Sequence, residues 1–289
     1  MKTQTPKGVR DLLPDDVDSR GDVVSTLRNI FKANGYRRII TPTFELNSVL
    51  KLGMASRLQK MSITFPDHNG NLMVLRPDMT TPIARVVGTR MGQQPKPIKL
   101  FYSANVYRQQ KPEAGRELEF YQAGVELFGQ NGVDVDAQII ALAVECLKAV
   151  GLKNFLIDIG HMGLINNLPP SKLEAFEKQD YVTLGDIPLR GTHEVIEKFP
   201  YFCELYEELK KLGVEEEHIC FNLGLVKEIG YYTGVVFDII DKGVGYFIGS
   251  GGRYDSLVGC YGDDCPAIGF AFGVERLLLS LEVERENRS

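Results

Sequence analysis

The sequence has no tryptophan, few histidines and cysteines, and no long apolar run. The five cysteines form no CxxC pair and are odd in number, which favours reduced thiols over a disulfide framework. The four histidines lie far apart in the chain, whereas zinc sites need paired ligands at short spacing, so we expect no metal. No stretch approaches roughly 18 consecutive apolar residues, and the N-terminus has no signal-peptide core. We therefore predict a cytoplasmic protein without a membrane segment or cofactor.

The charge balance also excludes some functions. The 289 residues carry a net charge of −5, and aromatic-basic clusters are absent. Both features argue against tRNA as a partner and against an RNA-binding module that has kept only a fold. The length allows one large core, or one core with a small appended subdomain.

The apolar pattern predicts an α+β domain around an antiparallel sheet, because hairpin-like strands dominate and the helices are grouped between them. Helices are expected near 15–34, 83–89 and 136–150, with a strand and helix across 267–281. Strands are expected at 38–41, 61–65, 72–75, 98–103, 117–128, 155–159, 220–225, 235–240 and 245–248. The stretch 163–215 is charged and helical, which indicates a helical insert, and 281–289 is predicted to be a frayed polar tail.

Four short motifs contain candidate binding residues. The glycine-rich run 249–255 permits close approach of a ligand to the backbone or forms a tight turn. In 269–277, Arg276 falls in the first turn of a helix, where it binds an anion or pairs with an acid. Gln122 and Glu126 share one face of a predicted strand. The adjacent Tyr231 and Tyr232 point to opposite faces if the strand geometry is regular.

In this order and spacing, the motifs resemble the catalytic domain of class II aminoacyl-tRNA synthetases, specifically histidyl-tRNA synthetase, along nearly the whole chain. Residues 6–14 are similar to the family's N-terminal signature, and 35–45 to motif 1, the dimer-interface motif. Motifs 2 and 3 correspond to 106–122 and 269–277, and the two histidine-specific motifs to 225–237 and 249–255. The resemblance implies a six-stranded antiparallel sheet flanked by helices, in a single domain covering 1–289.

By position, the resemblance also implies a histidine pocket. Its carboxylates would hold an ammonium or imidazole N–H, and its amide and hydroxyl groups would complete the hydrogen bonding. The implied histidine-binding residues are Asp78, Thr80, Arg108, Gln122, Glu126, Tyr231 and Tyr232. A vestigial ATP or anion site would use Arg116, Arg253 and Arg276.

Departures from the synthetase pattern predict that catalysis is lost. The family's Arg-Gly-Leu-Asp before the tyrosine pair is replaced by residues 227–230, which read Lys-Glu-Ile-Gly. In motif 2, Gln110, Leu118 and Tyr121 replace an acid, an arginine and a histidine. Lysine cannot reproduce the two-pronged contact of arginine, and fewer cations near the phosphates weaken stabilisation of transition-state charge. We also expect no anticodon-binding domain.

A partly retained pocket without catalysis resembles the regulatory subunits of ATP phosphoribosyltransferase, which begins histidine biosynthesis. The resemblance implies no catalytic residue in this chain. It implies activation of a short catalytic subunit, feedback inhibition by L-histidine, dimers of this chain, and a hetero-octamer with the catalytic chain. A histidyl-tRNA synthetase catalytic domain and a paralogue that aminoacylates another acceptor remain alternatives, and both require adenylate chemistry.

Overall fold

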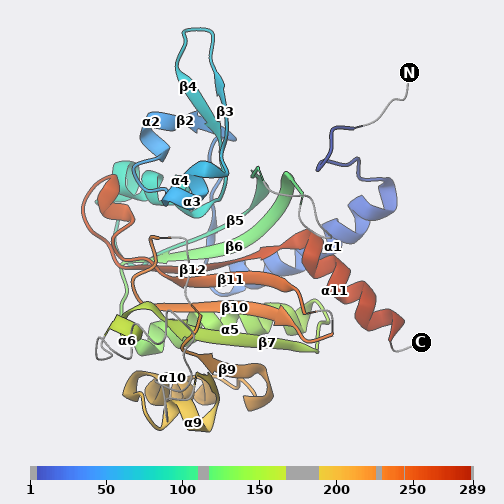
Figure 1. Ribbon diagram of the computed structural model, residues 1–289, viewed down its shortest axis with the longest axis vertical. Coiled ribbons are helices and arrows are strands. Elements are labelled where there is room, and N and C mark those ends of the chain that lie inside the picture. The colour runs from blue at the N-terminus through green and yellow to red at the C-terminus, as the bar shows by residue number, and fades with distance from the viewer. Residues whose placement is uncertain (1–4, 110–116, 167–188, 226–229, 244, 288–289) are drawn as a thin grey trace.

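A nine-stranded mixed sheet forms the centre of the molecule (Figure 1). The computed structural model describes residues 5–109, 117–166, 189–225, 230–243 and 245–287. The order across this sheet is β1-β5-β6-β12-β11-β10-β7-β9-β8. Its strands are β1 (Arg37–Arg38), β5 (Ile98–Tyr107), β6 (Glu119–Phe128), β7 (Phe155–His161), β8 (Arg190–Gly191), β9 (Ile219–Asn222), β10 (Val235–Asp241), β11 (Phe247–Arg253) and β12 (Ala267–Gly273).

The six central strands, from β5 to β7, pair with one another only in antiparallel fashion. This confirms the predicted α+β class and the antiparallel sheet flanked by helices. The edges differ from the prediction, because β1 runs parallel to β5 and β9 runs parallel to β7. Parallel pairs need a crossover rather than a tight turn, and no local signal in the sequence reports such a pairing.

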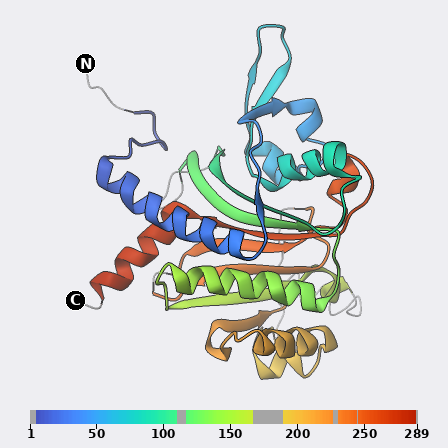
Figure 2. The same cartoon turned by 180° about the vertical axis from the view of Figure 1, so that it is seen from behind.

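Helices α1, α5 and α11 cover one face of the sheet (Figure 2). Helix α1 begins with a proline at its first position and two acids in its first turn, which suit the positive end of the helix dipole. Its Leu27 and Phe31 are fully buried against Phe101 and Phe270 of the sheet. The helices are α1 (Pro14–Ala33), α2 (Asn47–Leu50), α3 (Ser56–Lys60), α4 (Thr80–Val86), α5 (Val133–Ala149), α6 (Met162–Asn166), α9 (His193–Ile196), α10 (Pro200–Lys211) and α11 (Val274–Glu286). Shorter turns are η1 (Val87–Met91), η2 (Glu216–His218) and η3 (Val258–Cys260).

A second, three-stranded sheet projects beyond the edge of the main sheet where β5 lies (Figure 1). It has the order β2-β4-β3, with β2 (Phe44–Leu46), β3 (Ile63–Pro66) and β4 (Leu72–Leu75). One face packs Val74 onto α2 and α3. The register places only apolar side chains on the opposite face, and we call these the outer apolar face: Phe44, Leu46, Ile63, Phe65, Met73 and Leu75.

Three predictions about chain segments have different outcomes. The tail predicted at 281–289 is wrong, because α11 continues to Glu286 and buries Leu281. The glycine run 249–252 is not a turn but part of β11. The predicted helical insert at 163–215 lies partly outside the described residues, and its described part contains α6, β8, α9 and α10. Within the described ranges, no helix combines the length and apolar character needed to cross a bilayer.

Candidate functional site

Glu126 lies at the centre of a polar cluster on the sheet face opposite α1, α5 and α11. It comes from β6, is 1% exposed, and accepts a hydrogen bond from Thr80 Oγ1 at 2.7 Å. Its second oxygen accepts a hydrogen bond from the buried hydroxyl of Tyr254. Thr80 is the first residue of α4, and Tyr254 directly follows β11. Residues far apart in the sequence therefore hold one buried carboxyl group in a fixed position.

A second carboxyl group, that of Asp78, is close enough to the guanidinium of Arg108 for the two charges to attract each other. Asp78 is buried and accepts hydrogen bonds from the backbone N–H and the hydroxyl of Thr81, both at 3.1 Å. Arg108 donates from Nε to the carbonyl of Pro77 at 2.6 Å, and its guanidinium lies 5.2 Å from the ring centre of Phe120. Burial raises the pKa of Asp78, and the attraction to Arg108 makes that rise smaller.

Four tyrosines surround the two carboxyl groups. The ring centres of Tyr231 and Tyr232 are 4.9 Å apart, and that of Tyr231 is 5.8 Å from that of Tyr254. Tyr102 of β5 is buried in the same cluster. The expectation that adjacent tyrosines point to opposite faces is wrong here, because residues 230–234 precede β10 and do not have strand geometry. Both tyrosines therefore contribute to one site.

A row of glycines leaves room for these side chains. Gly269 of β12 lies between Glu126 of β6 and Gly252 of β11 in the sheet register. A Cβ atom on Gly269 would fall well inside 3.0 Å of the Glu126 carboxylate, and one on Gly252 would lie 2.8 Å from the Tyr232 ring. The glycine-rich motif was predicted either to let a ligand approach the backbone or to form a turn. In the structure its backbone is approached closely, but by the side chain of Tyr232.

Burial determines the charge state of the cluster. It raises the pKa of Glu126 to about 8, although the hydrogen bonds from Tyr254 and Thr80 act in the opposite direction. Burial likewise raises the pKa of Asp78, and it lowers the pKa of Arg108, which the neighbouring Asp78 opposes. At neutral pH, Glu126 therefore holds its proton. Asp78 and Arg108 attract each other electrostatically, which opposes the effect of burial on both groups. Such a site suits a ligand with a carboxylate and N–H groups.

The other predicted residues lie at the edge of this cluster or elsewhere. Gln122 is half-buried and lies four residues before Glu126 on the same face of β6, where it pairs with Gly273. Arg276 donates from Nη1 to the carbonyl of Phe247 at 2.7 Å. Arg116 lies outside the described residues.

Arg253 faces the other side of the sheet. Its guanidinium pairs with Asp136 and also donates to the carbonyl of Gln130 and to Asp255, both at 3.2 Å. The strand alternation explains this direction, because Gly252 faces the polar cluster and the next side chain must face α5. Arg253 therefore contributes to the fold behind the cluster.

Not every departure from the synthetase pattern affects the cluster directly. Tyr121 points to the helix-covered face, where its hydroxyl donates to the carbonyl of Ser103 at 3.0 Å. The guanidinium of Arg20 lies 5.0 Å from the centre of its ring. The backbone of Leu118 accepts a hydrogen bond from the N–H of Arg108 and donates one to the carbonyl of Gly8. Gln110 and residues 227–229 lie outside the described residues.

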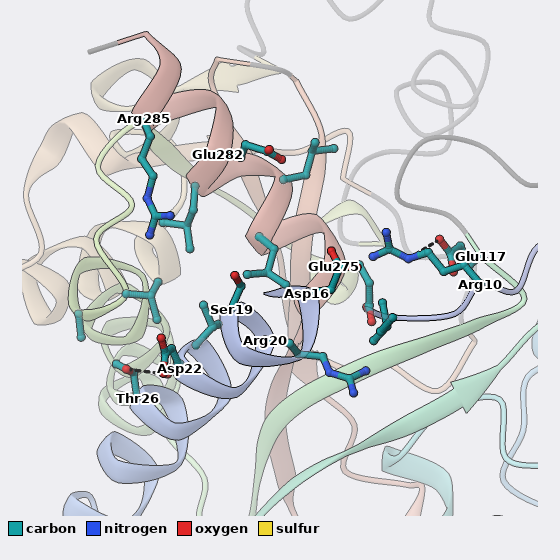
Figure 3. Close-up of a pocket in the computed structure, with 17 residues that line it drawn as sticks. Arg10, Asp16, Ser19, Arg20, Asp22, Thr26, Glu117, Glu275, Glu282 and Arg285 are labelled. Carbon is teal, nitrogen blue, oxygen red and sulfur yellow. Dashed lines mark hydrogen bonds and ion pairs between the residues drawn. The ribbon is translucent and has the colours of Figure 1, made fainter. Parts of the chain in front are cut away.

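A separate cleft of about 500 Å³ lies on the helix-covered face between α1 and α11 (Figure 3). Its charged lining is mixed, and Arg10 and Glu117 at its mouth form an ion pair of 3.2 Å. None of the residues predicted for the histidine pocket lines it. Among the described side chains, no three histidines, cysteines or acids are arranged to hold a metal ion.

Sequence and structure comparisons place these features among known proteins. The model of the histidyl-tRNA synthetase family matches residues 8–184 and 172–277. An ATP phosphoribosyltransferase regulatory subunit from Caldanaerobacter subterraneus subsp. tengcongensis is 38% identical, over 96% of this chain and 82% of that protein. A histidine–tRNA ligase from Methanocaldococcus jannaschii is 33% identical, over 98% of this chain and 78% of that protein. The crystal structure of an ATP phosphoribosyltransferase regulatory subunit/histidyl-tRNA synthetase from Bacillus halodurans has a TM-score of 0.88 at 31% identity, covering 97% of this chain and 84% of its own.

Proposed function

The chain belongs to the histidyl-tRNA synthetase family, in the branch of the ATP phosphoribosyltransferase regulatory subunits, and we propose that it activates a short catalytic chain and transmits feedback inhibition by L-histidine. The observation that carries this proposal is the polar cluster around Glu126. The cluster retains groups that complement histidine, while the sequence has lost cations that adenylate formation needs.

Histidine fits the cluster by charge and hydrogen bonding. Its carboxylate would pair with Arg108, and its ammonium group would approach Asp78. The imidazole would contact Glu126 and the tyrosine hydroxyls, with Gln122 and Thr80 completing the polar surroundings. The ligand would have to compete with the existing Asp78–Arg108 attraction, so binding would rearrange this pair rather than fill an inert space.

Loss of catalysis is supported by two kinds of observation. Lys227 and Leu118 stand where the synthetases have arginines, and Glu228 adds a negative charge next to Lys227. Arg253 is bound to Asp136 on the far side of the sheet, so its guanidinium does not reach a phosphate at the cluster. We therefore propose that this chain contributes no catalytic residue of its own to phosphoribosyl transfer.

The outer apolar face supports self-association as dimers, which would form the framework of a hetero-octamer with the catalytic chain. Phe44, Leu46 and Phe65 are 54%, 43% and 37% exposed, and they lie side by side on one sheet face. An apolar sheet face that the described part of the chain leaves exposed is typical of an interaction surface. Phe44 lies within the segment 35–45 that is similar to motif 1, which forms the dimer interface in the family.

The proposal is tested by measuring phosphoribosyl transfer from PRPP to ATP by the short catalytic chain, with and without this protein, while histidine is titrated. We expect strong activation and histidine-sensitive inhibition. The Glu126→Ala and Tyr231→Ala variants should still activate, and both should shift the histidine inhibition curve to higher concentrations. An exposed substitution on α11, Glu282→Ala, serves as the matched control.

The alternative function, histidine activation as a tRNA ligase, is favoured by the 33% identity to the Methanocaldococcus jannaschii enzyme. ATP–pyrophosphate exchange by this protein alone separates the two functions. Histidine-dependent exchange, together with no effect on the catalytic chain, would overturn the regulatory proposal.

A further inference from the structure

A buried ion pair lies directly behind the polar cluster. Arg253 and Asp136 are 4% and 3% exposed, and Nε of Arg253 donates to Asp136 at 2.9 Å. Moving two charges out of water is costly, and a lone buried charge is costlier still, so both partners are strongly held in place. Asp136 lies in the first turn of α5, and Arg253 ends β11. The pair thus fixes the end of the strand that lies beneath Tyr232.

The same arginine holds the tyrosine segment through its backbone. The carbonyl of Arg253 accepts a hydrogen bond from the N–H of Thr233 at 2.8 Å. Gly234 has no side chain, and a Cβ there would lie 3.0 Å from Cδ of Arg253. The carbonyl of Gly234 accepts from the N–H of Met162 at 2.9 Å. The two residues that follow Tyr231 and Tyr232 are therefore hydrogen-bonded to Arg253 and to the start of α6.

Tyr201 of α10 contacts both Asp136, the partner of Arg253, and His161, which lies next to α6. The hydroxyl of Tyr201 donates to the second oxygen of Asp136 at 2.7 Å. Its ring centre lies 4.5 Å from that of His161, which directly precedes Met162. A closed circuit of contacts therefore runs from the tyrosine segment through Arg253 and Asp136 to Tyr201, and back through His161. We call these four residues the rear network.

Helix α10 reaches the surface on the side remote from the polar cluster, packed along α5 below the sheet (Figure 1). Tyr201 is in its first turn, and the buried residues Phe202, Leu205 and Leu209 attach the helix to the core. A helix attached in this way moves as a rigid body, because close-packed interiors do not deform continuously. A small displacement at Tyr201 would therefore move the exposed face of α10.

We propose that the rear network couples the histidine site to α10, with Tyr201 as the positioning residue for the Tyr231–Tyr232 segment. This inference rests on the proposed function, because it assigns the route by which histidine occupancy leaves the site. Coupling between two sites is reciprocal, so a change at Tyr201 must alter histidine affinity although Tyr201 lies on the other side of the sheet.

The test is histidine binding to the full chain, measured by titration calorimetry, for the wild type and Tyr201→Phe. This variant removes one hydroxyl and retains the ring. We expect at least about fivefold weaker binding of L-histidine, since coupling factors of roughly 5 to 150 are typical. Tyr206→Phe is the matched control, because the Tyr206 hydroxyl on the same helix bonds to Glu216 outside the rear network, and its affinity should stay within twofold.

A double-mutant cycle distinguishes coupling from a merely structural role. In a Tyr232→Phe background, Tyr201→Phe should weaken histidine binding by a smaller factor than it does in the wild type. In the wild type, histidine should also slow amide hydrogen exchange across α10, a measurement that needs no variant.

The outcomes separate the two proposals. If the wild type binds histidine, and Tyr201→Phe binds it equally well with no change in α10 exchange, the coupling is refuted and the proposed function stands. A lower melting temperature of Tyr201→Phe with unchanged histidine affinity also refutes the coupling. If the wild type does not bind histidine, the histidine-binding function fails, and the coupling fails with it.

Discussion

The charge state of Glu126 leads to a prediction about stability against pH. In the folded chain its pKa is about 8, while a free glutamate titrates near 4.5. Between these values the unfolded chain has released the proton and the folded chain still holds it. Raising the pH through this window therefore favours unfolding. Stability from this group is complete below about pH 4.5 and is lost as the pH approaches 8.

The magnitude follows from the size of the shift. Each pH unit within the window changes the free energy of unfolding by at most ~1.4 kcal/mol, so the full displacement corresponds to ~5 kcal/mol as an upper bound. Glu126→Gln is neutral at every pH, and its side-chain oxygen can still accept the hydrogen bond from Thr80. Relative to this variant, we expect the wild type to lose about 3 kcal/mol between pH 5 and pH 8.

Urea unfolding of both proteins at pH 5, 6, 7 and 8 measures this difference directly. Glu282→Gln removes an exposed carboxylate from α11 and controls for the loss of one charge. If the stability curves of the wild type and Glu126→Gln run parallel, within about 0.5 kcal/mol, the buried carboxyl group is ionised throughout. The account of Glu126 as a neutral buried acid would then be wrong.

Three further predictions concern a buried glycine, the outer apolar face and the buried Arg253–Asp136 pair. Gly269→Ala should lower the free energy of unfolding by ~2–3 kcal/mol, because its Cβ would overlap the Glu126 carboxylate, whereas Gly21→Ala on α1 has free space and should be neutral or stabilising in the same urea assay. Phe65→Asp should convert dimers to monomers in light scattering, while Leu212→Asp, on the opposite part of the molecule and more exposed (47% against 37%), should not. Arg253→Met should cost ~3–5 kcal/mol in thermal unfolding, since it leaves a buried carboxylate unpaired, and a cost below ~1 kcal/mol would show that the carboxylate takes up a proton or water without strain.

The strand and helix pattern was largely predictable because apolar periodicity and turn residues report local geometry. The β3–β4 hairpin was identified from its Asn69-Gly70 turn, which suits positive φ, and Gly70 has φ 82°. The parallel pairing of β1 with β5 was not predictable, because it depends on a partner some sixty residues away that leaves no local signal.

The polar cluster was predictable only where the family's motifs covered it. The motifs supplied Asp78, Thr80, Arg108 and Glu126, and the structure brings these residues together. Tyr102 was missed, because within the apolar run of β5 it is indistinguishable from a core residue. The direction of Tyr231 and Tyr232 depended on where β10 begins, and strand boundaries are poorly determined by composition.

The alternation along β11 has consequences for how this protein can diverge. Gly252 and Arg253 are neighbours in the chain, yet one clears space for Tyr232 and the other neutralises Asp136. Two neighbouring residues are therefore under unrelated constraints: Gly252 on side-chain volume and Arg253 on charge. In a deep mutational scan read out on histidine inhibition, Gly252 should reject larger side chains and Arg253 should reject uncharged ones. Homologues that change their ligand should vary at the first position and keep the second.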